Sequence, residues 1–242
     1  MGENTTGMRF MTRDAIKYLA IVAMTLDHIA YIFLEPQTLL YRLFLCIGTF
    51  TGPVMLYFLI EGYFYTHDVR GYAKRLLLFA LLSQLPFSLA IGGFFGNMLF
   101  TLFICLGVLY VHDHVADGGL RKLLYVLLFF ASLFTDWNFL SVPLVLFLRP
   151  AFHTAAQRFY VDPAEQRRGM LKCVAYFIVV SCLTKGMLEG VTEALGMVLG
   201  FVCIAYFYNG QQAKTHRKFH KYFFYIYYPA HLLVLWGLHA IL

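Results

Sequence analysis

The sequence predicts an all-α fold: a polytopic transmembrane bundle of about nine helices, with the N-terminus in the cytoplasm and the C-terminus outside. Hydrophobic residues make up 60% of the 242 residues and charged residues only 13%, unlike the composition of a soluble domain. Apolar stretches long enough to cross a hydrocarbon core of about 30 Å recur along the chain. Basic residues gather in alternate loops, as they do on the cytoplasmic side of membrane proteins.

Nine spans are expected from the apolar stretches. The fifth and sixth are short and share a polar break at residues 135–138, so a re-entrant pair or one long bent element is the alternative there. Residues 153–169 form the largest loop, with a turn at Asp162–Pro163. We expect one integral-membrane domain over residues 1–242. In chain order, the expected spans are residues 16–34, 43–65, 74–92, 97–112, 122–135, 139–152, 170–187, 190–208 and 222–241.

The charge distribution supports this arrangement. With nine spans and a cytoplasmic N-terminus, all Lys and Arg residues except Arg42 and Lys185 fall on the inner side. The net charge of +6 therefore indicates attraction to anionic lipid or to anionic cytoplasmic ligands, and not a nucleic-acid partner. The five cysteines lie within spans without CxxC spacing, which predicts neither a disulfide framework nor a metal site.

The first span contains the most informative polar pair, Asp27 and His28. An Asp at this depth costs about 2.5–3.5 kcal/mol, so it usually serves a reaction or has a partner; the alternative is a polar pair that joins helices. Lys17 lies eleven residues before His28, on the same helix stripe and about 16 Å lower along the axis. Asp27 points about 100° away from His28, and we expect it to pair with Arg42 or Arg75.

The second span carries Gly52–Pro53, where we expect a kink, and then Glu61. We give equal weight to two roles for Glu61. It can form an ion pair with the cluster at Arg70, Lys74 and Arg75, or it can act directly in a site. Gln84 lies in the third span. Asn97 and Thr101 open the fourth span at i and i+4, where they can face an acceptor or link helices.

The last span carries Tyr222, Tyr225, Tyr228 and His231 at steps of three residues, beside Pro229. An aromatic stripe of this kind is more often packing or an interfacial belt than a site. Four polar tips on one track next to a proline kink nevertheless favour a site. Asp136, between the fifth and sixth spans, is a further candidate.

Taken together, these segments resemble the TraX family of conjugal pilin acetylation proteins. The chain departs from the family at Thr49, where the family often has arginine, and at Asp136-Trp137-Asn138, where it has Asp-Tyr-Gly. The Lys17-to-His28 spacing is also similar to the basic-residue-plus-histidine signature of acyltransferase-3-type membrane enzymes, in which the histidine is thought to be catalytic. The resemblance rests on residues 16–28, 53–66, 72–87, 97–102 and 222–232.

The resemblance implies a multi-pass inner-membrane transferase that moves an acetyl group from acetyl-CoA to the N-terminal amine of a pilin-like peptide or a similar acceptor. No metal is expected. His28 would act as general base, Asp27 would orient it through another helix or water, and Asn97, Thr101 or Tyr228 would stabilise the oxyanion. The expected CoA-binding residues are Lys17, Arg75, Lys221, Tyr222 and Tyr225, and the remaining site candidates are Glu61, Gln84, Asp136 and His231.

Two other classes of function fit the same polar residues. A small-solute or proton-coupled transporter would use Asp27, His28 and Glu61 as a relay, but it would favour an internal repeat with matching broken helices, which the sequence does not display. A noncatalytic assembly factor for surface appendages would use the aromatic helices to hold a partner. The sequence leaves the acceptor and the oligomeric state open.

Overall fold

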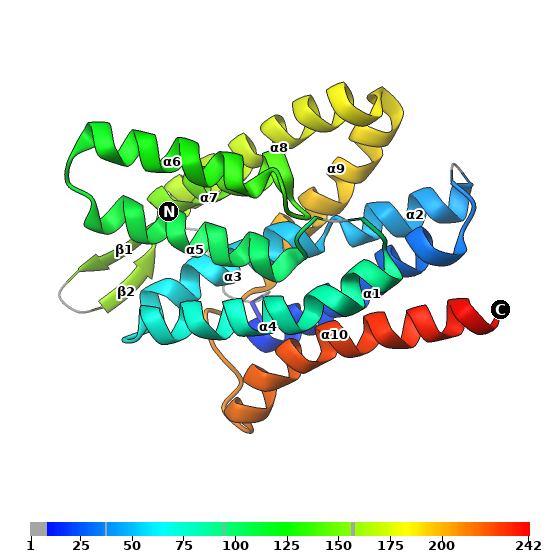
Figure 1. Ribbon diagram of the computed structural model, residues 1–242. Coiled ribbons are helices and arrows are strands. Elements are labelled where there is room, and N and C mark those ends of the chain that lie inside the picture. Colours follow the sequence, from blue (N-terminus) through cyan, green and yellow to red (C-terminus); the bar gives the residue numbers. More distant parts are fainter. Residues whose placement is uncertain (1–8, 37, 94, 156–157) are drawn as a thin grey trace.

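The computed structural model describes residues 9–36, 38–93, 95–155 and 158–242, and within them the chain is almost entirely helical (Figure 1). Five helical segments are long and apolar enough to cross a membrane: residues 13–33, 39–65, 69–90, 187–207 and 217–241. The protein is therefore a helical membrane protein. The helices are α1 (Arg13–Phe33), α2 (Leu39–Gly48), α3 (Thr51–Tyr65), α4 (Val69–Ala90), α5 (Met98–His114), α6 (Gly118–Ser132), α7 (Asn138–Leu148), α8 (Pro163–Lys185), α9 (Met187–Val202) and α10 (Arg217–Ile241).

Each expected span coincides with a helix, although nine membrane crossings and the orientation of the termini stay predictions. The expected second span is two helices, α2 and α3, that break at Thr49–Phe50. The interruption expected at Gly52–Pro53 lies within one turn before the proline, because Pro53 has no N–H for the Thr49 carbonyl, and Pro53 itself stands in the first turn of α3. A proline is tolerated there, since an N–H in the first turn has no partner within the helix.

Short polar side chains start most of the helices, as N-cap residues commonly do. Thr12 accepts a hydrogen bond from the Ala15 N–H at 3.3 Å, and Asp68 accepts one from Gly71 at 2.7 Å. Asp162 caps α8, whose first residue is Pro163; this is the position at which the sequence predicts a turn. The expected loop before it contains a hairpin of β1 (Phe152–Ala155) and β2 (Arg158–Val161).

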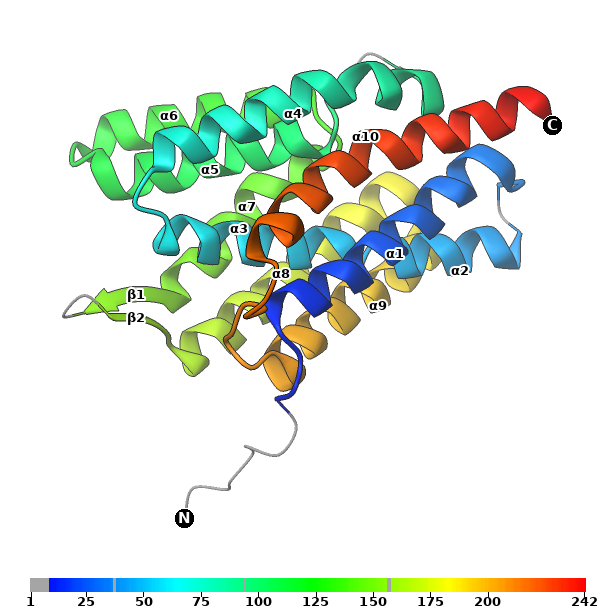
Figure 2. The same cartoon turned by 90° about the horizontal axis from the view of Figure 1, so that it is seen from below.

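Helix α3 occupies the centre of the bundle. Eleven of its 15 residues are buried, and it contacts α1, α5, α7 and α9. In Figure 2, α4, α5 and α6 lie on one side of α3, and α1, α2 and α9 lie on the other. The last helix, α10, packs against both α4 and α1, so His231 at one end of the sequence can meet His28 at the other.

Candidate functional site

Two cavities lie in the bundle, one on each side of a layer of side chains near the middle of α1. The basic cavity is about 310 Å³ and is lined by α1, α3, α4, α5 and α10. The carboxylate cavity is about 700 Å³ and is lined by α1, α2, α8, α9 and the connection between α6 and α7. The two cavities have no lining residue in common.

Five cations surround the basic cavity. Arg13 and Lys17 come from successive turns of α1, Arg217 and Lys221 from successive turns of α10, and Arg75 from α4. Asp14 also lines this cavity, but its Oδ2 accepts a hydrogen bond from the Ala213 N–H. The cavity therefore carries a strong excess of positive charge, which favours an anionic ligand.

Besides Lys17 and Arg75, which both line the basic cavity, the three other expected CoA-binding residues lie on α10, and two of these three line the same cavity. Lys221 and Tyr225 are the two that do so, whereas the half-exposed Tyr222 does not. Tyr225 stacks on Phe79, with ring centroids 4.7 Å apart. The Lys17 ammonium lies 3.9 Å from the centroid of the Phe224 ring, an attractive cation–π contact that holds it beside the cavity.

Met24, Met98 and Tyr228 line the basic cavity and form a layer beside His28, because Met24 stands one turn before His28 on α1 and the Tyr228 ring lies near the His28 ring. The Met98 N–H donates to the Tyr228 hydroxyl oxygen at 3.3 Å, which fixes Tyr228 while leaving its O–H proton free to donate. The rings of Tyr228 and His28 have centroids 6.5 Å apart. Lys17 and His28, which the sequence places on one stripe of the first span, therefore line different cavities.

His28 lines the carboxylate cavity and is only 6% exposed. Its Nδ1 lies 2.8 Å from Nε2 of His231, which is itself 7% exposed. The two rings are within 9° of parallel, with centroids 5.0 Å apart. Among the described residues, none forms a hydrogen bond with Nε2 of His28, so this nitrogen is available to a ligand in the cavity.

Three carboxylates line the same cavity, and two of them, Asp27 and Asp136, stand apart from the third, Glu193. Among the described residues, neither forms an ion pair with a cation. The expected partner of Asp27, Arg42 or Arg75, was therefore wrong; Arg75 lines the other cavity. Asp27 instead packs on Gly48 of α2, where an added Cβ would lie 2.2 Å from the Asp27 Oδ1.

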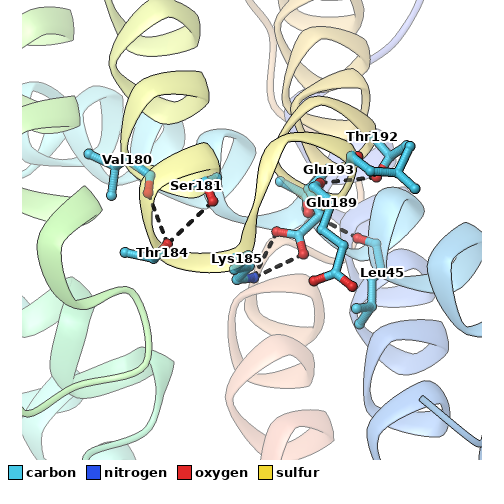
Figure 3. A network of polar contacts seen from close by, with 10 residues as sticks. Leu45, Val180, Ser181, Thr184, Lys185, Glu189, Thr192 and Glu193 are labelled. Carbon is cyan, nitrogen blue, oxygen red and sulfur yellow. Dashed lines mark hydrogen bonds and ion pairs between the residues drawn. The ribbon is translucent and has the colours of Figure 1, made fainter. Parts of the chain in front are cut away.

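An ion pair joins α8 to α9 at the edge of the carboxylate cavity (Figure 3). The Lys185 ammonium lies 2.9 and 2.8 Å from the two carboxylate oxygens of Glu193. Glu193 is 6% exposed, so the pair neutralises a buried charge. Thr184, in the same turn, donates to the carbonyl oxygen of Val180 at 2.9 Å.

The polar residues at the start of α5 hold helices together and line neither cavity. The Asn97 amide donates to the Ala80 carbonyl at 2.8 Å and to Gln84 Oε1 at 3.0 Å, while its own oxygen caps α5. Thr101 accepts a hydrogen bond from the Trp137 N–H at 3.5 Å. Their position supports a structural role, and of the three residues expected to stabilise an oxyanion only Tyr228 lines a cavity and lies near His28.

Glu61 also has structural partners. The Tyr208 hydroxyl donates to its Oε1 at 2.6 Å, and Arg13 lies 3.9 Å from its Oε2. The expected ion pair with the cluster at Arg70, Lys74 and Arg75 was wrong. Burial raises the pKa of Tyr208 and the Glu61 carboxylate raises it further, so the tyrosine stays protonated and ties the connection before α10 to α3.

Sequence reasoning missed several residues that the fold brings to the cavities. Arg13 and Arg217 line the basic cavity. They stand four residues before the expected ligand residues Lys17 and Lys221, so the i, i+4 spacing could have placed them on the same helix faces. Lys185 and Glu193 lie on either side of the turn at Gly186, which joins two expected spans. Opposite charges at the adjoining ends of two spans could have indicated an ion pair. Trp137, which packs on Gly52, gave no such signal.

Comparison with known proteins agrees with this reading of the sequence. Residues 12–239 match the model of the family described as TraX protein. The chain is 30% identical over 233 residues to a protein of Dichelobacter nodosus described as "Probable fimbrial assembly protein FimC, serogroup H1", with 91% of this chain and 92% of the relative covered. No solved structure matches the chain. The match over nearly the whole chain shows that this protein belongs to the TraX family.

Proposed function

We propose that this protein is a membrane-embedded acetyltransferase that moves the acetyl group of acetyl-CoA to the N-terminal amine of a pilin-like peptide, with His28 as general base. The observation that carries the proposal is the position of His28: it lines one cavity, while its ring lies 6.5 Å, centroid to centroid, from that of Tyr228, which lines the other. One imidazole thus stands between a cavity suited to an anion and a cavity suited to a cation.

The basic cavity fits the donor. Arg13, Lys17, Arg75, Arg217 and Lys221 offer five cations to the phosphates of CoA, with the forked arginine guanidinium groups suited to phosphate oxygens. From there the pantetheine arm would extend along α1 toward His28. The Met24, Met98 and Tyr228 side chains must move apart for the thioester to reach Nε2.

The carboxylate cavity fits the acceptor. An N-terminal amine is mostly protonated at neutral pH, and the Asp27 and Asp136 carboxylates attract such a cation next to His28. Phe139 and Trp137 supply apolar walls for the first side chains of the peptide. The amine loses its extra proton to one of these carboxylates or to water before it can attack.

The transfer step uses the free nitrogen of His28. As the neutral amine nitrogen bonds to the thioester carbonyl carbon, Nε2 of His28 takes one of its two protons, and the other stays on the amide nitrogen of the product. The C–S bond then breaks, and the imidazolium returns the proton to the departing CoA sulfur. Tyr228 donates its O–H to the carbonyl oxygen while that oxygen carries negative charge.

The test is acetyl transfer from labelled acetyl-CoA to a peptide with a free N-terminus, using purified protein in lipid nanodiscs. His28→Ala should lower the transfer rate by about 10²–10⁴-fold, the usual contribution of a general base, while the exposed His67→Ala control stays at the wild-type rate. Lys17→Glu should raise the Kd for CoA without altering the rate at saturation. An unchanged rate in His28→Ala rejects His28 as the base.

A transporter is the second candidate, because two cavities on opposite sides of a closed layer also suit alternating access. Proteoliposomes separate the two functions. Uptake of a labelled amine by wild-type protein, with no acetyl transfer in the same vesicles, would favour the transporter over the enzyme.

A further inference from the structure

We infer that His231 is a positioning residue that decides which nitrogen of His28 carries the proton. Its consequence for catalysis rests on the proposed function, but the protonation pattern itself follows from hydrogen bonds within the protein. The chain of bonds begins at a backbone carbonyl of α10, passes through His231 and ends at His28. When both rings are neutral, each link has one allowed donor, so the pattern can be followed from the carbonyl to His28.

The first link fixes His231. Its Nδ1 lies 2.9 Å from the carbonyl oxygen of Tyr227, and a carbonyl oxygen can only accept. Nδ1 of His231 therefore carries a proton. The carbonyl has two lone pairs, so it can accept this bond in addition to a helical N–H. In the neutral ring, Nε2 of His231 is then a bare acceptor.

The second link fixes His28. Nδ1 of His28 lies 2.8 Å from that bare Nε2, so Nδ1 must donate and must carry the proton. The nearly parallel rings and the centroid separation of 5.0 Å show that the rings meet edge to edge, as this bond requires. Nε2 of neutral His28 is left unprotonated. The lone pair that a general base needs is thus directed away from His231.

A doubly protonated His231 would reverse this assignment, because His28 would then accept at Nδ1 and carry its proton on Nε2. That state places a cation at a position only 7% exposed. Among the described residues, no carboxylate forms a hydrogen bond or ion pair with either ring. A buried imidazolium without such a partner is costly, so the neutral pair is favoured.

The ring of His231 is itself held in place by Tyr227. Thr25 donates its hydroxyl proton to the Ile21 carbonyl at 2.9 Å, so the Tyr227 hydroxyl, 2.9 Å from Thr25 Oγ1, must be the donor in their bond. This bond fastens α10 to α1. The rings of Tyr227 and His231 then stack, with centroids 5.1 Å apart and planes within 11°, so His231 cannot turn away from His28 without breaking the stack.

Loss of His231 removes the acceptor for Nδ1 of His28. The free imidazole then exchanges between its two tautomers, and the fraction with a bare Nε2 facing the cavity falls. A carboxylate plays the corresponding role for the histidine of serine proteases, where the wrong tautomer lowers the rate severely. In this protein the group that accepts the hydrogen bond from Nδ1 of His28 is the neutral imidazole of His231, and not a carboxylate.

Nitrogen NMR on protein labelled with ¹⁵N in its histidine rings tests the assignment. His28→Asn identifies the His28 signals by their loss. In the wild type, Nδ1 of His28 should show an attached proton and Nε2 should not. His231→Leu should shift the Nε2 signal toward the protonated position, and His231→Gln should retain the wild-type pattern, because its side-chain oxygen can accept from Nδ1. The exposed His239→Leu on the same helix is the control and should leave both signals unchanged.

The rate measurement follows the same series. His231→Leu should lower kcat for acetyl transfer by less than the roughly 10²–10⁴-fold expected for His28→Ala, because both tautomers stay populated. KM for either substrate should change little, and His231→Gln should recover most of the loss. A proton on Nε2 of His28 in the wild type, or the same tautomer in His231→Leu, overturns the inference. If the wild type transfers no acetyl group, the proposed function fails, yet the NMR series still tests the role of His231.

Discussion

The contact between α2 and α9 leaves no room for a side chain at Gly196, and substitution by alanine should weaken the bundle measurably. An added Cβ at Gly196 would lie 1.8 Å from the carbonyl oxygen of Cys46 and 2.9 Å from its carbonyl carbon. Carbon and oxygen atoms rarely approach closer than about 3.3 Å. The deficit of about 1.5 Å must be met by separating the two helices, because the clashing atoms belong to the backbone.

The expected change in the free energy of unfolding of Gly196→Ala combines a cost of overpacking with a gain in helix propensity. Forcing an extra carbon into a packed interior typically costs about 1–3 kcal/mol. Alanine in place of a glycine inside a helix returns about 1 kcal/mol. Gly107→Ala in α5 isolates this second contribution, since its added Cβ would meet only the end of Leu128 at 3.6 Å, an ordinary contact. The difference between the two variants therefore reports the packing cost.

Equilibrium unfolding in mixed micelles, followed by intrinsic fluorescence, measures both variants. We expect the free energy of unfolding of Gly196→Ala to fall below that of Gly107→Ala by about 1–3 kcal/mol. Because α2 and α9 also carry Gly48 and Glu193 of the carboxylate cavity, acetyl transfer should weaken in the same variant. Equal free energies in the two variants would refute the close approach of α2 to α9.

Two further changes test the polar contacts around the cavities. Lys185→Met should lower the free energy of unfolding by about 1–3 kcal/mol, because Glu193 is left buried without its partner, and the double change with Glu193→Gln should restore most of the loss; no restoration would contradict the pairing. Asn97→Asp should cost about 2 kcal/mol or more in the same assay, because a carboxylate cannot donate to the Ala80 carbonyl or to Gln84. A stability equal to wild type would show that these donors are dispensable.

The positions of the helices were predictable because apolar length and capping residues are local signals. The interruption of the expected span 43–65 was predictable only in part: Pro53 marks the region, but the chain breaks earlier, at Thr49–Phe50. The hairpin before α8 was missed, since its strands are only four residues each and interrupt a polar, basic segment.

The candidate site was less predictable, because its contacts join residues far apart in the sequence. The tyrosine and histidine stripe of α10 predicted that His231 belongs to a site, but not that it bonds to His28, which lies 203 residues away. The environment of Asp27 depends on Gly48, a residue with no side chain to suggest a partner. The partners proposed for Asp27 and Glu61 came from charge alone, and charge does not determine which helices are neighbours.

The layer of Met24, Met98 and Tyr228 has a consequence for the cell as well as for the reaction. A membrane protein with water-accessible hollows on both sides risks becoming a leak for protons and small ions. Two methionines and an aromatic ring stand between the two cavities, and, if the proposed function holds, the flexible thioether chains can move aside for an acyl chain and return. Replacing the methionines with polar residues should therefore make the membrane permeable to ions even where the protein folds normally.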